Sequence, residues 1–298
     1  MTDHAFVTRK RELAELEACL GRALGGRGQI RFVVGDAGSG KSALVAEFTR
    51  RAQKAHPDLL VAVGNCDAQT GLGDPYLPLR EVLSLLTGDV EPKLAQGAIT
   101  EENAKRLRSF FARSGQILIE LGPDLVNVLV PGSRLFFLAG KVIAEKVGWV
   151  DKLEQLVKKK KKAAIDQSHI FEQVTRVLQG LAAKRPLIVV VEDLQWADAA
   201  SIGLLFRLAR RIDESSILLI GTYRPADVAL GRKGERHPLE GVVNELQRYY
   251  GDLQIDLSRA IADEGRTFVE AFLDTEPNRL GDDFRQALFR HTGGHPLF

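Results

Sequence analysis

The segment Gly35-Asp36-Ala37-Gly38-Ser39-Gly40-Lys41-Ser42 fits the phosphate-loop pattern G-x-x-x-x-G-K-S/T at every fixed position. Glycines allow backbone angles at which successive N–H groups point inward and form a nest for phosphate oxygens. A helix that starts directly after the loop adds the partial positive charge of its N-terminus. In such a loop Lys41 reaches the β- and γ-phosphates, and the Ser42 hydroxyl joins the coordination shell of magnesium. The pattern therefore predicts a site for ATP or ADP with Mg²⁺.

Two carboxylates, Glu192 and Asp193, directly follow the apolar run 187–191. A buried strand that ends in two acids is what a magnesium nucleotide site needs opposite its phosphate loop. One carboxylate can orient the water shell of the metal, and the second can accept a proton from attacking water. Both acids are therefore candidate metal ligands and catalytic residues, and the question of which one faces Mg²⁺ stays open.

Three further residues near these acids call for an interpretation. Arg224 follows the apolar run 217–220, and in a parallel sheet ligands gather at the carboxyl ends of the strands. Arg224 is therefore a candidate catalytic residue near the phosphates, although its position fits an ordinary surface arginine equally well. Asp198, ahead of Ala-Ala-Ser, is expected to cap a helix. Trp196 is expected to pack rather than stack on a base.

Short apolar runs at 30–34, 59–63, 187–191, 217–220 and 253–257 read as strands, and helical spacing appears between and after them. Strands that alternate with helices imply a parallel sheet covered on both faces. We therefore expect an α/β fold: a three-layer phosphate-loop sandwich with a mostly parallel five-stranded sheet. Residues 1–257 would form the nucleotide-binding core, with a largely helical insertion over 72–168, and residues 258–298 would form a helical lid.

The composition excludes several classes of protein. Of the 298 residues 45% are hydrophobic, enough for a sizeable core, and 41 basic residues against 39 acidic ones give a net charge of +2. This balance does not support a nucleic-acid partner, and the run Lys158–Lys162 is expected to be a solvated segment because no aromatic residue interleaves it. Two cysteines, no signal peptide and no long apolar stretch favour a cytoplasmic protein without a membrane partner.

The chain resembles the bacterial AAA-type ATPases of the STAND class, which act as nucleotide switches in large regulators. Four segments carry the resemblance: 6–13 (FVTRKREL) is similar to F-V-G-R-x-x-E-L, 35–42 is the phosphate loop, 192–198 (EDLQWAD) is similar to D/E-D-L-x-W-A-D, and 293–298 (GGHPLF) is similar to G-G-x-P-L-F. The chain departs from the family at Thr8, which replaces a glycine, and at Glu192, which is longer than the usual aspartate. Residues 64–79 also look like the loop after the second strand of the family.

The resemblance implies roles that the spacing does not show. Val7 and Arg9 would lie beside the adenine, and Pro296 would close over the base from the lid. Arg224 would sense the γ-phosphate. Glu192 would serve the metal, and Asp193 would position or activate water.

We therefore expect an ATP-binding switch with weak or conditional Mg²⁺-dependent hydrolysis of ATP to ADP and phosphate, within a signalling or regulatory protein. Its partners would be other proteins or C-terminal effector modules beyond Phe298, with nucleotide-dependent self-association. Two alternatives share the phosphate loop: a DNA-associated ATPase of the replication-initiator kind and a small-molecule kinase. The near-neutral charge argues against the first, and the W-A-D segment and the long insertion argue against the second.

Overall fold

The protein is described from a computed structural model, which covers residues 9–67, 75–126, 128–132, 135, 138, 149–158, 166–231 and 236–292, without the side chains of 259–264 and 268. A five-stranded sheet forms its centre. The strands are β1 Gln29–Val34, β2 Leu60–Asn65, β3 Leu187–Glu192, β4 Ile217–Tyr223 and β5 Gln254–Asp256. Their spatial order is β2-β3-β4-β1-β5, and every pairing is parallel.

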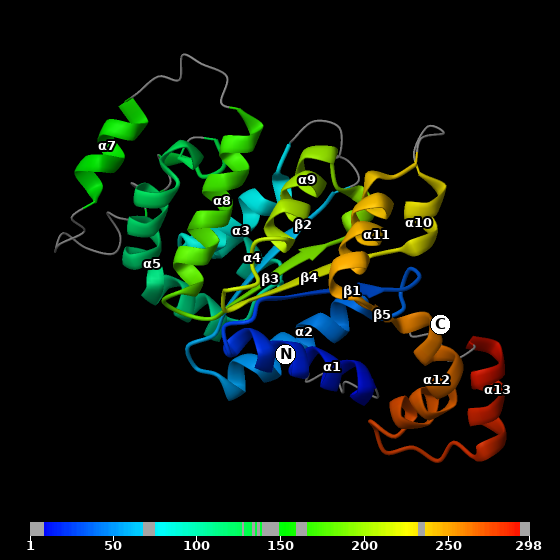
Figure 1. Ribbon diagram of the computed structural model, residues 1–298. Coiled ribbons are helices and arrows are strands. Elements are labelled where there is room, and N and C mark those ends of the chain that lie inside the picture. Colours follow the sequence, from blue (N-terminus) through cyan, green and yellow to red (C-terminus); the bar gives the residue numbers. More distant parts are fainter. Residues whose placement is uncertain are drawn as a thin grey trace.

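The helices cover both faces of this sheet. They are α1 Lys10–Leu24, α2 Lys41–Ala55, α3 Leu77–Leu86, α4 Glu91–Ala95, α5 Glu101–Leu121, α7 Val150–Lys158, α8 Gln167–Ala182, α9 Ala199–Ala209, α10 Pro225–Leu230, α11 Pro238–Tyr250, α12 Leu257–Leu273 and α13 Asp282–Thr292, with short 3-10 turns η1 Pro123–Leu125 and η2 Leu194–Trp196. In Figure 1, α1 and α2 lie on one face and α3, α8, α9 and α11 on the other. The expected three-layer α/β fold is confirmed.

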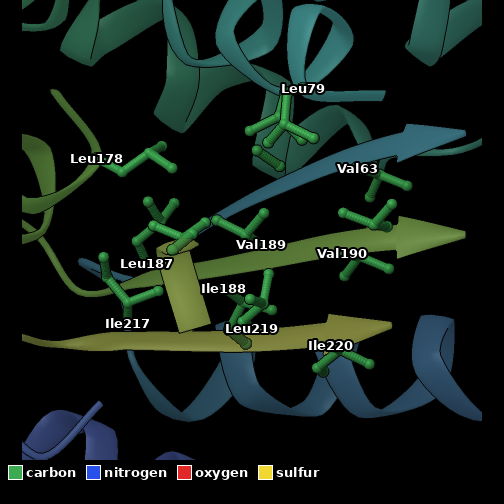
Figure 2. Packing of buried hydrophobic residues seen from close by; sticks show 14 of the residues in the cluster. Val63, Leu79, Leu178, Leu187, Ile188, Val189, Val190, Ile217, Leu219 and Ile220 are labelled. Atoms are coloured by element: carbon green, nitrogen blue, oxygen red, sulfur yellow. The ribbon is translucent and has the colours of Figure 1, made fainter. Parts of the chain in front are cut away.

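The central strands form because they are continuous apolar runs, as parallel strands buried on both faces must be. Every residue of β4 is buried, and in β3 only the last residue, Glu192, is partly exposed. Figure 2 shows Leu79 of α3 and Leu178 of α8 on one side of these strands, with Val190 and Ile220 toward the opposite layer. Apolar side chains are therefore packed on both faces of the sheet. This packing holds the strand ends, and the loops that follow them, in fixed positions.

The part of the expected insertion (72–168) that the structure describes is mostly helical. Its longest helix is α5, which begins where the Thr100 hydroxyl accepts a hydrogen bond from the Asn103 N–H at 3.1 Å. Glu101 and Glu102 add negative charge to the first turn, which stabilises a helix N-terminus. Helix α5 packs along α8 beside the sheet, so the insertion is joined to the core over a broad surface.

Helix α3 lies unusually close to β2. A Cβ atom added at Gly64 would stand 2.0 Å from the backbone oxygen of Pro78, much closer than real contacts allow. Only a glycine in β2 lets the first turn of α3 approach the strand to this distance. This contact seats α3, and with it the start of the insertion, against the carboxyl half of β2.

We expect Gly64→Ala to destabilise the fold by about 1–3 kcal/mol, because the backbone of Pro78 cannot move without lifting α3 from the sheet. Thermal unfolding of the purified variant would measure the effect. Gly241→Ala in α11 is the matched control: nothing lies within 4 Å of its added Cβ, so it should be neutral or stabilising by about 0.4–1 kcal/mol. Equal melting temperatures for the two variants would contradict the close contact.

The last two helices project from the end of the sheet where β5 lies (Figure 1). Helix α12 begins directly after β5, where the Asp256 carboxylate accepts a hydrogen bond from the Ser258 N–H at 2.9 Å. Helices α12 and α13 make up most of the described part of residues 258–298.

Among the described helices none is both long enough and apolar enough to span a bilayer.

Candidate functional site

The site lies at the carboxyl edge of the sheet, where strand register brings distant segments together. Val34, the last residue of β1, pairs with Tyr223 of β4 on one side and with Asp256 of β5 on the other. The next residues are Gly35, Arg224 and Leu257, so the phosphate loop starts between Arg224 and the first residue of α12. One strand further along, β4 pairs with β3, which ends at Glu192.

The phosphate loop depends on glycines with positive φ. Gly38 and Gly40 have φ angles of 74° and 89°, a region that other residues rarely adopt. Gly40 occupies the N-cap position of α2, so the first N–H groups of that helix are open toward the loop. The chain therefore forms a turn with positive φ angles ahead of a helix N-terminus, a geometry suited to holding an anion.

The Lys41 side chain is buried and curls back over this loop. Its Nζ donates to the backbone oxygens of Gly35 at 2.8 Å and Asp36 at 2.7 Å. Burial lowers the pKa of Lys41, and the nearby Arg224 guanidinium lowers it further, while Asp193 and Asp36 oppose this shift. Arg224 and Asp193 are therefore near enough for their charges to act on Lys41.

Glu192 meets the phosphate loop through Ser42. Burial raises the pKa of Glu192, whereas a hydrogen bond with the Ser42 side chain and the charge of Lys93 lower it. The hydroxyl and the carboxylate that were candidate magnesium ligands are thus neighbours, Ser42 in the first turn of α2 and Glu192 at the end of β3. Oxygen ligands of these two kinds suit Mg²⁺, so the residues present fit the metal.

Asp193 has a left-handed backbone conformation, with φ at 56°, and this turn re-aims the chain after β3. Its N–H donates to the Thr222 hydroxyl at 3.0 Å, and its carboxylate accepts a hydrogen bond from the Gln195 amide at 2.8 Å. Such a conformation costs a non-glycine residue free energy, and strained residues of this kind cluster at functional sites. Asp198, by contrast, caps α9 as expected, accepting from the Ala200 and Ser201 N–H groups at 2.8 and 2.9 Å.

Arg224 stands at the end of β4, beside the loop that follows β1 and the acids that follow β3. Its guanidinium forms an ion pair with Asp227 at 3.6 Å and is about one-third exposed. The Nε atom is buried and makes no hydrogen bond to any described residue. Arg224 is therefore held beside the loop and the acids by Asp227, with its buried Nε unpaired among the described residues.

Arg9 connects three segments of the chain. Its guanidinium donates to the backbone oxygen of Ser39 at 3.3 Å and to that of Leu257 at 3.1 Å. The residue is buried and has a φ of 70°, in the left-handed region that residues other than glycine rarely adopt. The expected partners of Arg9 at the adenine, Val7 and Pro296, lie outside the described residues, as do Thr8 and most of the run Lys158–Lys162.

A profile of the AAA ATPase domain matches residues 5–220. The chain belongs to this family. It is also 26% identical over 295 residues to the uncharacterized protein R02095 of Rhizobium meliloti (strain 1021), a match that covers 98% of this chain. The chain spans about a quarter (24%) of the length of that curated relative. An AAA ATPase domain binds nucleotide, which agrees with the geometry of the phosphate loop.

This AAA ATPase domain has a cationic group at its site that the sequence patterns did not reveal. Lys93 of α4 is buried, and its Nζ lies 2.7 Å from the Glu81 carboxylate and 3.3 Å from the Asn65 side-chain oxygen. The Asn65 N–H also donates to Glu81, at 2.7 Å. Because Asn65 pairs with Glu192 across β2 and β3, the insertion supplies a buried positive charge close to the acids.

Proposed function

We propose that this AAA ATPase domain is a nucleotide switch that binds Mg²⁺-ATP and hydrolyses it slowly, within a signalling or regulatory protein of the STAND class. The observation that carries the proposal is the register of β1, β3 and β4, which groups Lys41, Ser42, Glu192, Asp193 and Arg224 at one edge. The charges of Arg224 and Asp193 both act on the pKa of Lys41 there. This is the arrangement that phosphoryl transfer requires, since that reaction depends on positioning and electrostatic stabilisation.

The residues divide the work as follows. The loop 35–42 and the N-terminus of α2 would hold the phosphates, with Lys41 exchanging its bonds to loop carbonyls for phosphate oxygens. Ser42 and Glu192 would hold Mg²⁺, which when bound offsets negative charge on the phosphates. Asp193 would orient the attacking water and accept its proton, as the water oxygen bonds to the γ-phosphorus and ADP departs with the electrons of the broken P–O bond.

The domain division belongs to the same proposal: a core over 1–257 and a helical lid over 258–298, with ATP and ADP favouring different positions of the lid. The proposed boundary lies close to the phosphate loop: a Cβ placed at Gly35 would stand 3.3 Å from the Cβ of Leu257, the residue at which the core would join the lid. Other domains, partner proteins or further copies of this chain would bind differently to the two positions of the lid. The protein would act in the cytoplasm. The chain matches only 24% of the length of the Rhizobium meliloti relative, which agrees with the proposal that such a domain works within a larger protein.

Calorimetry with ATP and with ADP, combined with phosphate release on the same sample, tests the function. We expect binding of both nucleotides and slow release of phosphate without an added acceptor. Phosphate release that requires a small-molecule acceptor would favour a kinase. Salt-dependent binding of duplex DNA would favour the replication-initiator alternative.

Arg224→Ala is expected to weaken ATP binding about tenfold or more while leaving ADP affinity nearly unchanged. The planar guanidinium can donate two hydrogen bonds to a terminal phosphate that ADP lacks, and only differential affinity lets a nucleotide shift a conformational equilibrium. The affinities for both nucleotides, measured by calorimetry, check this. Arg248→Ala, in an exposed position of α11, is the control for loss of an arginine. Equal losses for ATP and ADP would exclude a γ-phosphate sensor.

A further inference from the structure

The side-chain amide of Gln195 bridges the ends of two neighbouring strands. Gln195 lies in η2, directly after β3, and is 1% exposed. Its Nε2 donates to the Asp193 carboxylate at 2.8 Å, and its Oε1 accepts a hydrogen bond from the Arg224 N–H at 3.2 Å. A backbone N–H can only donate, so the oxygen of the amide must face Arg224 and the nitrogen must face Asp193.

Asp193 is thus linked to β4 through both its main chain and its side chain. Its N–H donates to the Thr222 hydroxyl in β4. Within the turn after β3, its backbone oxygen also accepts a hydrogen bond from the Trp196 N–H at 2.8 Å. Its side chain is linked through Gln195 to the residue that follows Tyr223, the end of β4. The carboxylate is therefore linked through Gln195 to the main chain of Arg224, the residue proposed to sense the γ-phosphate.

We propose that Gln195 is a positioning residue for ATP hydrolysis: it holds the Asp193 carboxylate in one orientation and transmits displacement of the Arg224 segment to it. This inference rests on the proposed function and adds to it a physical link between sensing and hydrolysis. Gln195 would act through Asp193, with no contact to nucleotide required. Because the amide is neutral, it fixes the carboxylate without changing the net charge of the site.

Two substitutions of similar size distinguish positioning of the Asp193 carboxylate by Gln195 from a purely structural role of Gln195 in the turn after β3. Gln195→Glu keeps the shape but replaces the donor with a second carboxylate that repels Asp193. Gln195→Met keeps the length and apolar bulk but removes both hydrogen bonds. We expect kcat to fall about tenfold to hundredfold in either variant, since a misplaced catalytic group costs rate, while the affinity for Mg²⁺-ATP stays within about threefold.

Gln173 of α8 provides a matched control. It is also buried, its Nε2 donates to the Asp124 carboxylate at 2.7 Å, and its Oε1 accepts from the Asp124 N–H at 3.0 Å. Gln173→Glu therefore removes an amide bridge of the same chemistry away from the carboxyl edge. We expect a similar loss in melting temperature for Gln173→Glu and Gln195→Glu, with kcat lowered only in the latter.

The experiment measures phosphate release, Mg²⁺-ATP affinity by calorimetry and thermal unfolding for the parent and these variants. A double variant, Arg224→Ala with Gln195→Met, tests the link to sensing. Arg224→Ala keeps the main-chain N–H that Gln195 contacts and removes only the guanidinium proposed to sense the γ-phosphate. If Gln195 transmits displacement of that segment, the two losses of kcat should be less than additive. Parental kcat in Gln195→Met, equal loss of kcat in Gln173→Glu, or strictly additive effects in the double variant would overturn the inference. A parent that binds ATP and releases no phosphate would overturn the proposed hydrolysis itself.

Discussion

Asp193→Asn is expected to leave Mg²⁺-ATP bound while slowing its hydrolysis by about 10²–10⁴-fold, the range that positioned acid–base help contributes. Asparagine has nearly the same shape, and its side-chain oxygen can still accept the hydrogen bond from Gln195 at the position seen for the carboxylate. What it cannot do is accept a proton from water. Phosphate release under single-turnover conditions, with affinity measured separately, would record the effect.

Asp198→Asn is the control for this substitution, because it removes the same charge a few residues away. Asp198 caps α9, and asparagine is an equally good N-cap, so both fold and hydrolysis should persist. If Asp193→Asn keeps the parental rate of hydrolysis and Glu192→Gln loses it, then Glu192 activates water and the roles proposed for the two acids are exchanged. Equal loss of Mg²⁺-ATP binding in both variants would show that they share the metal.

Lys41→Ala is expected to weaken ATP binding about tenfold to hundredfold, because it removes a charge-assisted contact worth roughly 1.5–3 kcal/mol. The fold should persist, since the apolar residues that pack α2 against the sheet, Leu44, Val45 and Phe48, are unchanged. Calorimetry measures the affinity, and circular dichroism checks the fold.

Lys54→Ala changes the same helix and the same charge at an exposed position, and it should bind ATP as the parent does. Both variants lose one ammonium group from α2, but only Lys41→Ala loses it at the phosphate loop. If Lys41→Ala and the parent bind ATP with the same affinity, the nucleotide does not bind at residues 35–42.

The phosphate loop and the paired acids could be predicted because their chemistry is contiguous in the chain. Eight adjacent residues define the loop, and a strand of apolar residues leads directly into Glu192 and Asp193. The place of Arg224 followed from a single topological rule, that ligand-binding residues gather where parallel strands end. The pairing of β3 with β4 confirms that Arg224 follows the strand beside the one that carries Glu192.

Other parts of the site depend on contacts between distant segments, which no local pattern encodes. The ion pair of Lys93 with Glu81 joins two short helices of the insertion, and its effect on Glu192 appears only when β2 lies beside β3. Gln195 was visible in the motif, yet its second partner lies 29 residues away. Helix α5 is a different case, because its N-cap at Thr100 followed by two glutamates is a helix start signal within the local sequence.

The two hydrogen bonds from the Arg9 guanidinium have a mechanical consequence. One ends on the phosphate loop at Ser39 and the other at Leu257, where α12 begins. A rearrangement of the loop as small as an ångström would break or strain one of these bonds unless α12 shifted with it. The Arg9 side chain thus links the phosphate loop to the first residue of α12. We expect this link to couple movement of the loop to movement of α12, and Arg9→Ala to let the two move independently.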